Sequence, residues 1–446
     1  MPCKGGESVS SQLSPDLVPF PEASRSGRAK PACEGRRLRG INSEGSYAYV
    51  LMRLAVYTDY VYRRVAGVTY AERAFAVFLA SLVSHVEHLR LIGRLAPDVG
   101  EGHYALPPGV SLAPLPHYGS LADARASLRS LAASVRHMNR ALDDVEVLWV
   151  LGPYPHAILL ALLGLCRRRT VVLGVRQNWP AYVRMRRPGR RWMHWAADVL
   201  ECVWRKLAKR LPVVAVGAEL SEIYAHAPAV LDLAVSLVPA AAVGPPKTPR
   251  DYQGELRVLS VGRLDAEKNP LMLAEVLALL LTRDTRWRLV VCGQGDLEAA
   301  LESRLRELGI ADRAELLGYV PMGDGLWDLY RSCHVLLHVS WTEGFPQVLI
   351  EALATGLPVV ATAVGGVRAG VGRAAVLVPP GDADAAAKAL WRVATDADLR
   401  SRLSAAGFER AHRLTLEFQS ERLVNFLNTA HREAQARRSK AGARRQ

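Results

Sequence analysis

The chain has 446 residues, with 57 basic and 43 acidic side chains and a formal net charge of +14, and half of its residues are apolar. This length exceeds what a single hydrophobic core fills, so two domains of roughly 200 residues each are expected. The composition is typical of a folded α/β protein and excludes a fibrous or wholly disordered chain. The positive charge favours anionic partners, but no nucleic-acid recognition motif accompanies it, so we expect no nucleic-acid binding.

The six cysteines are scattered without a Cys-x-x-Cys pair, which predicts reduced thiols in a cytoplasmic protein. The longest apolar run, residues 157–166, is about half of what a membrane-spanning helix requires. The amino-terminal region also lacks the apolar core of a signal peptide. We therefore expect a cytoplasmic protein, with peripheral attachment to the inner face of the plasma membrane as an alternative.

The amino-terminal segment, residues 1–48, is rich in Ser, Pro, Gly and Arg and has no apolar periodicity. Such a segment cannot bury enough apolar surface to offset its chain entropy, so we expect a disordered extension. The first strand is expected at Leu51–Tyr57. Met52 is therefore a candidate for the natural start of the protein.

From residue 49 onward, short Val- and Leu-rich runs alternate with amphipathic stretches, which predicts βα units and parallel sheets. We expect a first Rossmann-like domain at 49–243, a Pro-rich linker at 244–255 and a second Rossmann-like domain at 256–415. A helix at 416–430 is expected next, packing back on the first domain, followed by a basic tail at 431–446. The clearest further strands are expected at 145–151, 170–175, 212–216, 257–261, 288–292, 335–339 and 358–361.

Four residues of the first domain are candidates for its ligand-facing edge. Gly67 precedes Thr69-Tyr70-Ala71-Glu72, a capping-box pattern that predicts the start of a helix at Ala74–Val83, so Gly67 is placed at a helix amino end. A plain helix start is an equal alternative. His156 follows one expected strand, and Arg176 and Asn178 follow the next; for His156 a structural role at a helix start competes with a catalytic one.

The stretch from residue 184 to 210 combines dense arginines and lysines with tryptophans at helical spacings. A helix of this kind is able to lie on an anionic membrane, with its indole rings at the interface. The alternative is a basic, solvated helix whose tryptophans pack onto its own domain.

In the second domain, an expected strand ends at Gly262 and is followed by Arg263 and Lys268. A glycine at a strand end allows the backbone to approach a ligand closely. Two cations at the carboxyl edge of a parallel sheet are suited to neutralising a diphosphate without a metal. A solvated loop is the alternative for this pattern taken alone.

About eighty residues later, Glu343-Gly344-Phe345-Pro346 is followed by Glu351 and then by Gly356. Pro346 is well placed as the first helical residue and Gly356 as the stop, so Glu343 lies on the entry loop and Glu351 lies inside the helix. The two carboxylates and the helix amino end are suited to hydroxyl and anionic oxygens, which favours a ligand that contains a carbohydrate.

The motifs Gly-Arg-Leu…Glu-Lys-Asn (262–269), Glu-Gly-Phe-Pro…Glu-Ala (343–352) and Ala-Thr-Gly-Leu-Pro-Val-Val-Ala-Thr (354–362) resemble family 4 of the retaining glycosyltransferases. The resemblance covers residues 256–425 and includes Val-Cys-Gly-Gln-Gly (291–295) and Leu-Leu-Gly-Tyr-Val-Pro (316–321). It implies the GT-B fold, in which two facing Rossmann-like domains with parallel sheets enclose a cleft. One departure is Gly365-Gly366-Val367-Arg368, where the family often has Pro-Glu after the two glycines.

The resemblance also implies roles for individual residues in binding a UDP-sugar or GDP-sugar and in the transfer of its sugar. Arg263, Lys268 and Glu343 are then the catalytic residues, with the two cations on the diphosphate and Glu343 on the donor sugar. Glu351 contacts the ribose, and the remaining donor-binding positions are Gly262, Gly318, Tyr319, Val320, Gly344, Phe345 and Pro346. The acceptor, a lipid-linked glycan, a polysaccharide or a small molecule, is expected at the first domain, and a role in cell-envelope glycan synthesis follows from this.

Two other functions compete with sugar transfer: a nucleotide-sugar epimerase of the same fold, and a nucleotide-sugar-binding protein without catalysis. No cofactor and no metal are expected. Asp382-Ala383-Asp384 and Asp396-Ala397-Asp398 superficially match a metal-binding Asp-x-Asp motif, but both open expected helices, where Asp commonly caps. His334 and His338 lie on an expected strand, without a zinc-binding helix motif.

Overall fold

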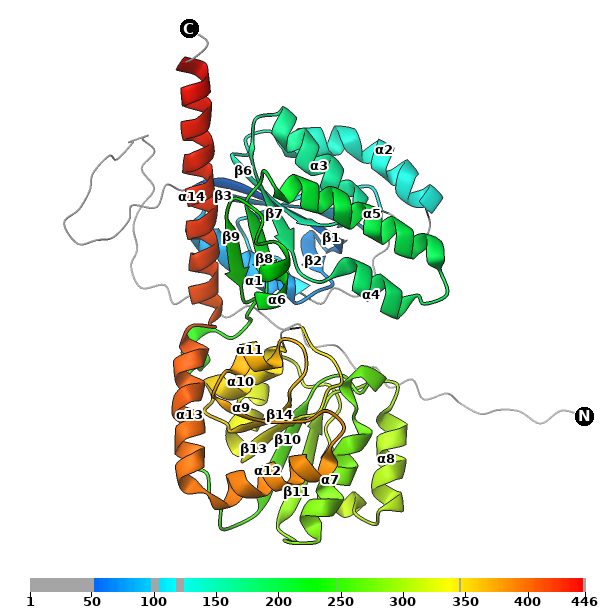
Figure 1. Ribbon diagram of the computed structural model, residues 1–446, viewed down its shortest axis with the longest axis vertical. Helices are drawn as coiled ribbons and strands as arrows, with labels where there is room; N and C mark the ends of the chain where they lie inside the picture. The colour runs from blue at the N-terminus through cyan, green and yellow to red at the C-terminus, as the bar shows by residue number, and fades with distance from the viewer. Residues whose placement is uncertain (1–51, 98–103, 118–123, 247, 345, 444–446) are drawn as a thin grey trace, which may run out of the picture.

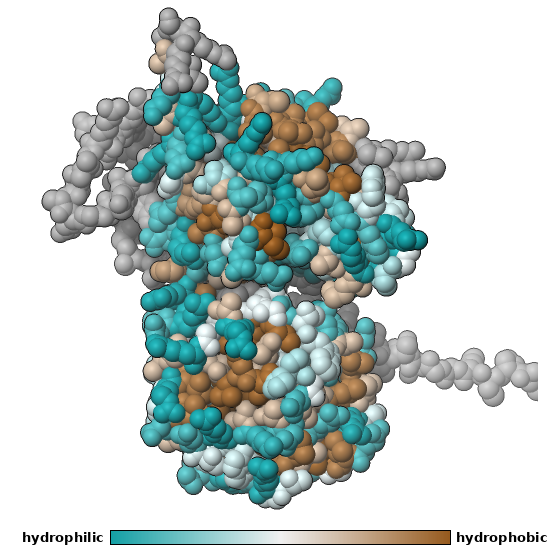
Figure 2. Space-filling model, in the orientation of Figure 1, coloured by the Kyte–Doolittle hydropathy of each residue, from teal (hydrophilic) through white to brown (hydrophobic). Residues whose placement is uncertain are grey.

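The structure is a computed structural model that describes residues 52–97, 104–117, 124–246, 248–344 and 346–443. Two lobes are stacked along the long axis of the molecule, and each is a β-sheet flanked by helices (Figure 1). Figure 2 shows the constriction between the lobes. The segment 1–48, expected to be disordered, lies outside the described residues. No helix of the described part of the chain is long and apolar enough to cross a membrane.

The described residues of the N-terminal lobe form a nine-stranded sheet. Seven of the strands run parallel in the order β5-β3-β1-β6-β7-β8-β9. The short strand β2 pairs antiparallel with the last four residues of β1, and β4 pairs antiparallel with β2. The strands are β1 Arg53–Val65, β2 Val68–Ala71, β3 His88–Leu95, β4 Tyr104–Ala105, β5 Val110–Leu115, β6 Val147–Gly152, β7 Thr170–Val175, β8 Val213–Val216 and β9 Val230–Leu233.

Helices cover both faces of this sheet, as buried parallel strands require. Strand β7 is buried at every position, in keeping with its unbroken apolar sequence. The α-helices of the lobe are α1 Phe75–Ser81, α2 Ala124–Ala141, α3 Pro155–Cys166, α4 Trp179–Arg186, α5 Arg191–Ala208 and α6 Ala218–Ile223, with 3-10 turns at Leu82–His85 and Ala240–Ala242.

The first strand continues well past Tyr57 and turns back through Ala66 and Gly67 into β2. Both turn residues have positive φ, 47° and 82°, and Val65 pairs with Val68 across them. A two-residue turn with two positive φ angles is the usual connection of a tight hairpin.

The prediction that Gly67 lies at a helix amino end was therefore wrong. Thr69 and Tyr70, taken as part of a capping box, lie in β2, and α1 begins only at Phe75, without a side-chain cap. The physical reason is that Val, Thr and Tyr on both sides of Gly67 favour strands, and the glycine supplies the turn between them.

The C-terminal lobe holds a six-stranded parallel sheet among its described residues, in the order β12-β11-β10-β13-β14-β15. Its strands are β10 Leu256–Val261, β11 Trp287–Cys292, β12 Ala314–Leu316, β13 Val335–His338, β14 Val359–Thr362 and β15 Ala375–Val378. The described residues of 244–255, the expected linker, form no helix or strand. The α-helices of the C-terminal lobe are α7 Leu271–Leu281, α8 Glu298–Glu307, α9 Asp324–Ser332, α10 Gln347–Ala354, α11 Val367–Val371, α12 Ala383–Thr395 and α13 Ala397–His412.

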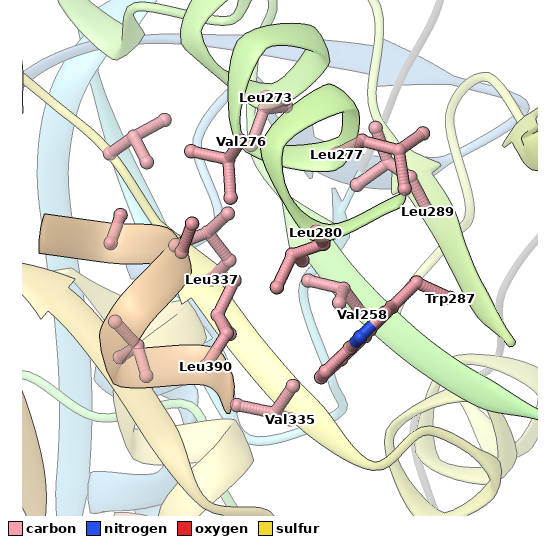
Figure 3. Packing of buried hydrophobic residues seen from close by; sticks show 14 of the residues in the cluster. Val258, Leu273, Val276, Leu277, Leu280, Trp287, Leu289, Val335, Leu337 and Leu390 are labelled. Carbon is pink, nitrogen blue, oxygen red and sulfur yellow. The ribbon is translucent and has the colours of Figure 1, made fainter. Parts of the chain in front are cut away.

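One face of this second sheet is covered by α7 and α12 (Figure 1). Figure 3 shows leucines and valines of α7 pointing down onto Val258, Trp287 and Leu337 of the strands, with Leu390 of α12 closing the cluster. The labelled residues Val258, Trp287, Leu337 and Leu390 are all buried. This core holds the strand ends, and the loops that follow them, in fixed positions.

The last helix, α14 (Leu416–Ala443), runs back along the N-terminal lobe (Figure 1). Ser420 hydrogen-bonds to Ser81 at 2.6 Å, and His431 to Thr170 at 2.9 Å. The segment 431–446, predicted to be a tail, is therefore helical as far as Ala443. The reason is its composition: Ala, Arg, Glu, Gln and Lys are strong helix formers, and no Gly or Pro interrupts the helix before Gly442.

Candidate active site

The loops after β10 and β11 meet at the carboxyl edge of the second sheet, the edge at which open α/β sheets bind ligands. Gly262 and Gly293 follow the two strands, with φ of 153° and 150°. A Cβ on Gly293 would lie 1.8 Å from the carbonyl oxygen of Gly262, so the two backbones approach closely enough to require glycine. In the sequence, Gly293 is only part of a connecting motif, and nothing in that motif indicates this packing role.

The two predicted diphosphate-binding cations lie in different surroundings. The Arg263 side chain is exposed and forms ion pairs with Asp265 and Glu267 of its own loop. Lys268 is more buried, and its Nζ lies 2.5 Å from Oε1 of Glu343. Exposed ion pairs contribute little free energy, so those of Arg263 are easily exchanged for an incoming anion.

Glu343 is the centre of a polar cluster at the carboxyl end of β13. Its Oε1 accepts hydrogen bonds from Lys268 Nζ and, at 2.6 Å, from Ser340 Oγ, and lies 2.9 Å from His338 Nε2. Burial by itself would raise the pKa of Glu343, but the bond to His338 and the charge of Lys268 lower it to about 2. The carboxylate is therefore ionised at neutral pH, beside a cation that balances it.

His338 and Ser340 also belong to this cluster, and neither is among the binding residues predicted from the sequence, where His338 is only a rejected zinc ligand. Both side chains are buried, and Nδ1 of His338 has no hydrogen-bond partner among the described residues. Their place at and just beyond the end of β13 was the available signal, because polar residues at the carboxyl end of a parallel strand face the ligand edge.

The backbone of Glu343 is fixed by the two-glycine loop that departs from the family pattern. Gly366 N donates to the Glu343 carbonyl at 3.2 Å, and a Cβ on Gly365 would lie 1.9 Å from the same oxygen. The two glycines therefore position the entry to α10, although Val367 and Arg368 follow them in place of the family's Pro-Glu.

Glu351 is buried inside α10, eight residues after Glu343. Tyr330 Oη donates to its Oε2 at 2.6 Å, while Oε1 has no hydrogen-bond partner among the described residues. Burial raises the pKa of Glu351, and the bond from Tyr330 partly offsets this. One carboxylate oxygen is thus held by the protein and the other is left to accept a hydrogen bond.

Gly318, Tyr319 and Val320 follow the short strand β12. The carbonyl of Gly318 accepts from Gly293 N at 2.7 Å, which joins this segment to the loop after β11. The Tyr319 side chain is exposed and lies against Tyr104 of the N-terminal lobe; burial, and then Tyr319, raise the pKa of Tyr104. The segment therefore lies where the two lobes meet.

The segment between the two glutamates enters α10. Gly344 is exposed and Pro346 is buried. Pro346 is the N-cap of α10 and not its first helical residue, so the helix begins one residue later than expected. Phe345, another predicted donor-binding residue, lies outside the described residues. Gln347, which is not among the residues predicted from the sequence, accepts a hydrogen bond from Leu237 N at 3.0 Å and so ties α10 to the segment that leaves the N-terminal lobe.

On the N-terminal lobe, His156 is buried at the start of α3, 3.4 Å from Ser130 Oγ. Burial, followed by the charge of Arg94, lowers the pKa of His156 to about 4, so the ring is neutral at pH 7. This environment favours the structural role. Gly67, in its hairpin turn, is not at a helix amino end.

Arg176 and Asn178 lie at the carboxyl end of β7. The guanidinium carbon of Arg176 lies 3.9 Å from the centre of the Phe75 ring, and its Nε is buried without a hydrogen-bond partner among the described residues. Asn178 caps α4 by accepting from Ala181 N at 3.2 Å. Arg176 is thus a cation at the ligand edge, stacked on an aromatic ring and unpaired with any described carboxylate.

Residues 246–410 match the sequence profile of the family described as "Glycosyl transferases group 1". The C-terminal lobe is therefore similar to the group 1 glycosyltransferases. The D-inositol 3-phosphate glycosyltransferase of Corynebacterium urealyticum is 35% identical to it over 195 residues, which make up 41% of this chain and 46% of that protein. The chain therefore spans less than half the length of this curated relative.

Solved structures similar to this chain include sucrose-phosphate synthase from Thermosynechococcus elongatus, with a TM-score of 0.61 and 19% identity over 85% of this chain and 98% of that one. Anabaena Alr3699/HepE in complex with UDP gives a TM-score of 0.60 at 14% identity, over 85% and 100% of the two chains. The expected α/β fold is confirmed: the chain has the GT-B fold.

The described residues of the chain contain no group of three or more His, Cys, Asp or Glu side chains arranged to hold a metal ion. Asp382 and Asp396 cap α12 and α13 by accepting from Ala385 N and Leu399 N, each at 2.8 Å. Both Asp-x-Asp pairs thus start helices, as their sequence context predicted.

Proposed function

We propose that this protein is a glycosyltransferase, which transfers a sugar from a nucleoside-diphosphate sugar to an acceptor with retention of anomeric configuration. The observation that carries the proposal is the cluster around Glu343, in which a balanced cation and carboxylate lie at the carboxyl edge of the second sheet. UDP in the structurally similar Anabaena protein supports a nucleoside diphosphate as the leaving group.

The roles follow from charge and position. Lys268 and Arg263 stabilise the negative charge that develops on the departing diphosphate, and no metal is used. Glu343 holds Lys268 in place and accepts hydrogen bonds from the donor sugar. Glu351, with one oxygen anchored by Tyr330, uses the other for a ribose hydroxyl. Retention and a front-face reaction without a protein nucleophile follow from the family resemblance.

The acceptor is placed at the facing edge of the N-terminal lobe. Arg176 is suited to an anionic or hydroxyl-rich acceptor, because its guanidinium has no carboxylate partner among the described residues and lies over the Phe75 ring. Asn178, at the exposed start of α4, is the second candidate contact.

The assay is incubation of the protein with UDP- and GDP-sugars and a cell lipid extract, with nucleotide release and new glycoconjugates measured together. Transfer predicts equimolar nucleoside diphosphate and product, with the donor's anomeric configuration kept in the NMR spectrum of the product. A 2-epimer of the donor would instead identify an epimerase. Donor binding without turnover for every acceptor would identify a non-catalytic binding protein.

We further propose that the acceptor is reached at an anionic membrane surface, to which the N-terminal lobe attaches through α4 and α5. Trp192, Trp195, Val199 and Cys202 are all exposed and recur every three or four residues, so they form an apolar stripe along one face of α5. Exposed arginines at 184, 186, 187, 190 and 191 precede the stripe. By contrast, Trp204 is buried, so the alternative of packed tryptophans holds for this residue.

Sedimentation with vesicles tests this attachment. Wild type is expected to sediment with vesicles containing phosphatidylglycerol and not with pure phosphatidylcholine, and Trp192→Ser/Trp195→Ser is expected to remain in the supernatant. Phe418→Ser, a change at an exposed aromatic residue of α14, is the matched control. Equal sedimentation of the double variant and the wild type would refute attachment through α5.

A further inference from the structure

A pocket of about 260 Å³ lies between α14 and the N-terminal lobe, far from the edge that faces the donor site. Thr170 and Pro212, at the beginnings of β7 and β8, line it from one side. Thr429 and Ala430 of α14 line it from the other. The strands run away from this pocket toward Arg176, so it lies at the opposite end of the sheet. We name it the α14 pocket.

The α14 pocket is rich in arginines, most of which make no ion pair in the described chain. Arg169, Arg210, Arg437 and Arg438 line it, and the carboxylate among its lining residues, Glu433, is paired with Arg437 at 3.5 Å. The other three arginines make no ion pair with a described carboxylate, and Nε of Arg169 is buried without a hydrogen bond.

The arginines also repel one another. Partial burial, followed by the charges of Arg168 and Arg169, lowers the pKa of Arg438. Placing like charges around one concavity costs free energy in the empty protein, and an anion bound there removes that cost.

The remaining wall of the pocket is apolar. Leu165, Leu211, Pro212 and Phe426 line it, and the Leu165 side chain is 40% exposed, so apolar surface is open to a ligand. Arginine forks around an apolar wall match a ligand with a phosphate at one end and a hydrocarbon portion at the other.

We propose that the α14 pocket binds a phosphate-bearing amphiphile, with its phosphate between Arg169, Arg210 and Arg438 and its apolar part against Leu211 and Phe426. The chemistry is shared by the headgroup region of an anionic lipid and by a free phosphate ester. Because the pocket is remote from the donor edge, ligand binding there does not depend on the proposed transfer reaction and is tested separately from it.

Isothermal titration calorimetry with dihexanoyl phosphatidate, kept below its micelle concentration, tests the site directly. Wild type is expected to bind it, and Arg210→Gln/Arg438→Gln to bind at least about tenfold more weakly, since each lost contact is a charge-assisted hydrogen bond. Arg136→Gln/Arg140→Gln, which removes the same charge from the exposed face of α2, is expected to bind like wild type.

Two further ligands separate the sources of the phosphate. Dihexanoyl phosphatidylcholine carries the same chains without net charge and is expected to bind much more weakly. Inorganic phosphate is expected to bind more weakly than phosphatidate and with the same sensitivity to the Arg210/Arg438 variant; phosphate held at the donor site would not show that sensitivity. Phosphate as tight as phosphatidate would overturn the role of the apolar wall.

Equal phosphatidate affinity in wild type and both double variants would overturn the site itself. Circular dichroism checks that the variants fold. Arg210→Gln alone, a change at an exposed side chain without an ion pair in the described chain, gives a second variant for which weaker phosphatidate binding is again expected.

Discussion

Glu343 shows most clearly how single residues determine the chemistry of this site. A buried carboxylate is costly unless it is paired, and here one oxygen is shared by a lysine, a serine and a histidine. The cluster therefore stabilises the folded protein as well as preparing it for an anionic ligand. Because the pKa of Glu343 is lowered from 4.5 to about 2, this contribution depends on pH.

The direction of the pKa shift determines whether this stabilisation is lost at low or at high pH. A group whose pKa is lower in the folded state stabilises fully above its unfolded pKa, and that stability is lost as the pH falls through the folded pKa. The Glu343 contribution, roughly 3 kcal/mol, is thus present above about pH 4.5, and about half of it should be lost by pH 3. Urea unfolding of wild type and Glu343→Gln should converge in stability over this interval, whereas Glu302→Gln, at an exposed position on α8, should keep a constant difference from wild type.

For Glu351, one measurement separates ribose binding from a purely structural role. If its free oxygen accepts a bond from a ribose hydroxyl, Glu351→Gln should weaken binding of the preferred nucleoside diphosphate about tenfold but leave binding of its 2′,3′-dideoxy analogue almost unchanged. Calorimetry on both ligands measures the difference. Equal losses for the two ligands would mean that the substitution only disturbs the buried Tyr330–Glu351 contact.

At the scale of elements, the glycines after β10 and β11 determine whether the site can form. Gly293→Ala would place a Cβ 1.8 Å from a backbone oxygen that cannot move without shifting β10. We expect it to abolish nucleotide binding and to destabilise the fold by several kcal/mol. Gly309→Ala is the matched control, because its φ is +68° with open space around it; it should cost only about 1–2 kcal/mol and leave binding intact.

The elements also show what the sequence could and could not predict. Strand β7 was predicted to its exact bounds, because an unbroken apolar run flanked by polar residues leaves little choice. The β1–β2 hairpin was missed because its Ala66-Gly67 turn precedes a pattern that also reads as a capping box. Local sequence could not decide between them; pairing with β3 and β4 did.

The site was predictable where family motifs reach, and less so where it depends on tertiary contact. Lys268 and Glu343 were both named from sequence, but nothing in their spacing of 75 residues gives the contact between them. His338 was visible as a strand-end residue, yet its role emerges only when β13 and the loop before α10 are brought together.

At the scale of the whole molecule, α14 joins the C-terminal part of the chain to the N-terminal lobe by packing against that lobe. Leu423, Val424 and Leu427 are fully buried in the core that contains Trp149 and Phe78. Leu423→Ala should therefore lower the free energy of unfolding by about 2–5 kcal/mol. Phe418→Ala, at a largely exposed position of the same helix, should change it far less. Urea unfolding followed by circular dichroism compares the two; equal effects would mean that α14 does not contribute to this core.

The most direct test of the whole account is sugar transfer by Lys268→Ala, with Lys388→Ala as the matched control on α12, where the lysine is exposed and paired with Asp384. If Lys268 stabilises the departing diphosphate, its loss should reduce kcat about 100- to 1000-fold while circular dichroism remains that of wild type, and Lys388→Ala should retain full activity. Wild-type turnover by a correctly folded Lys268→Ala variant would contradict the account.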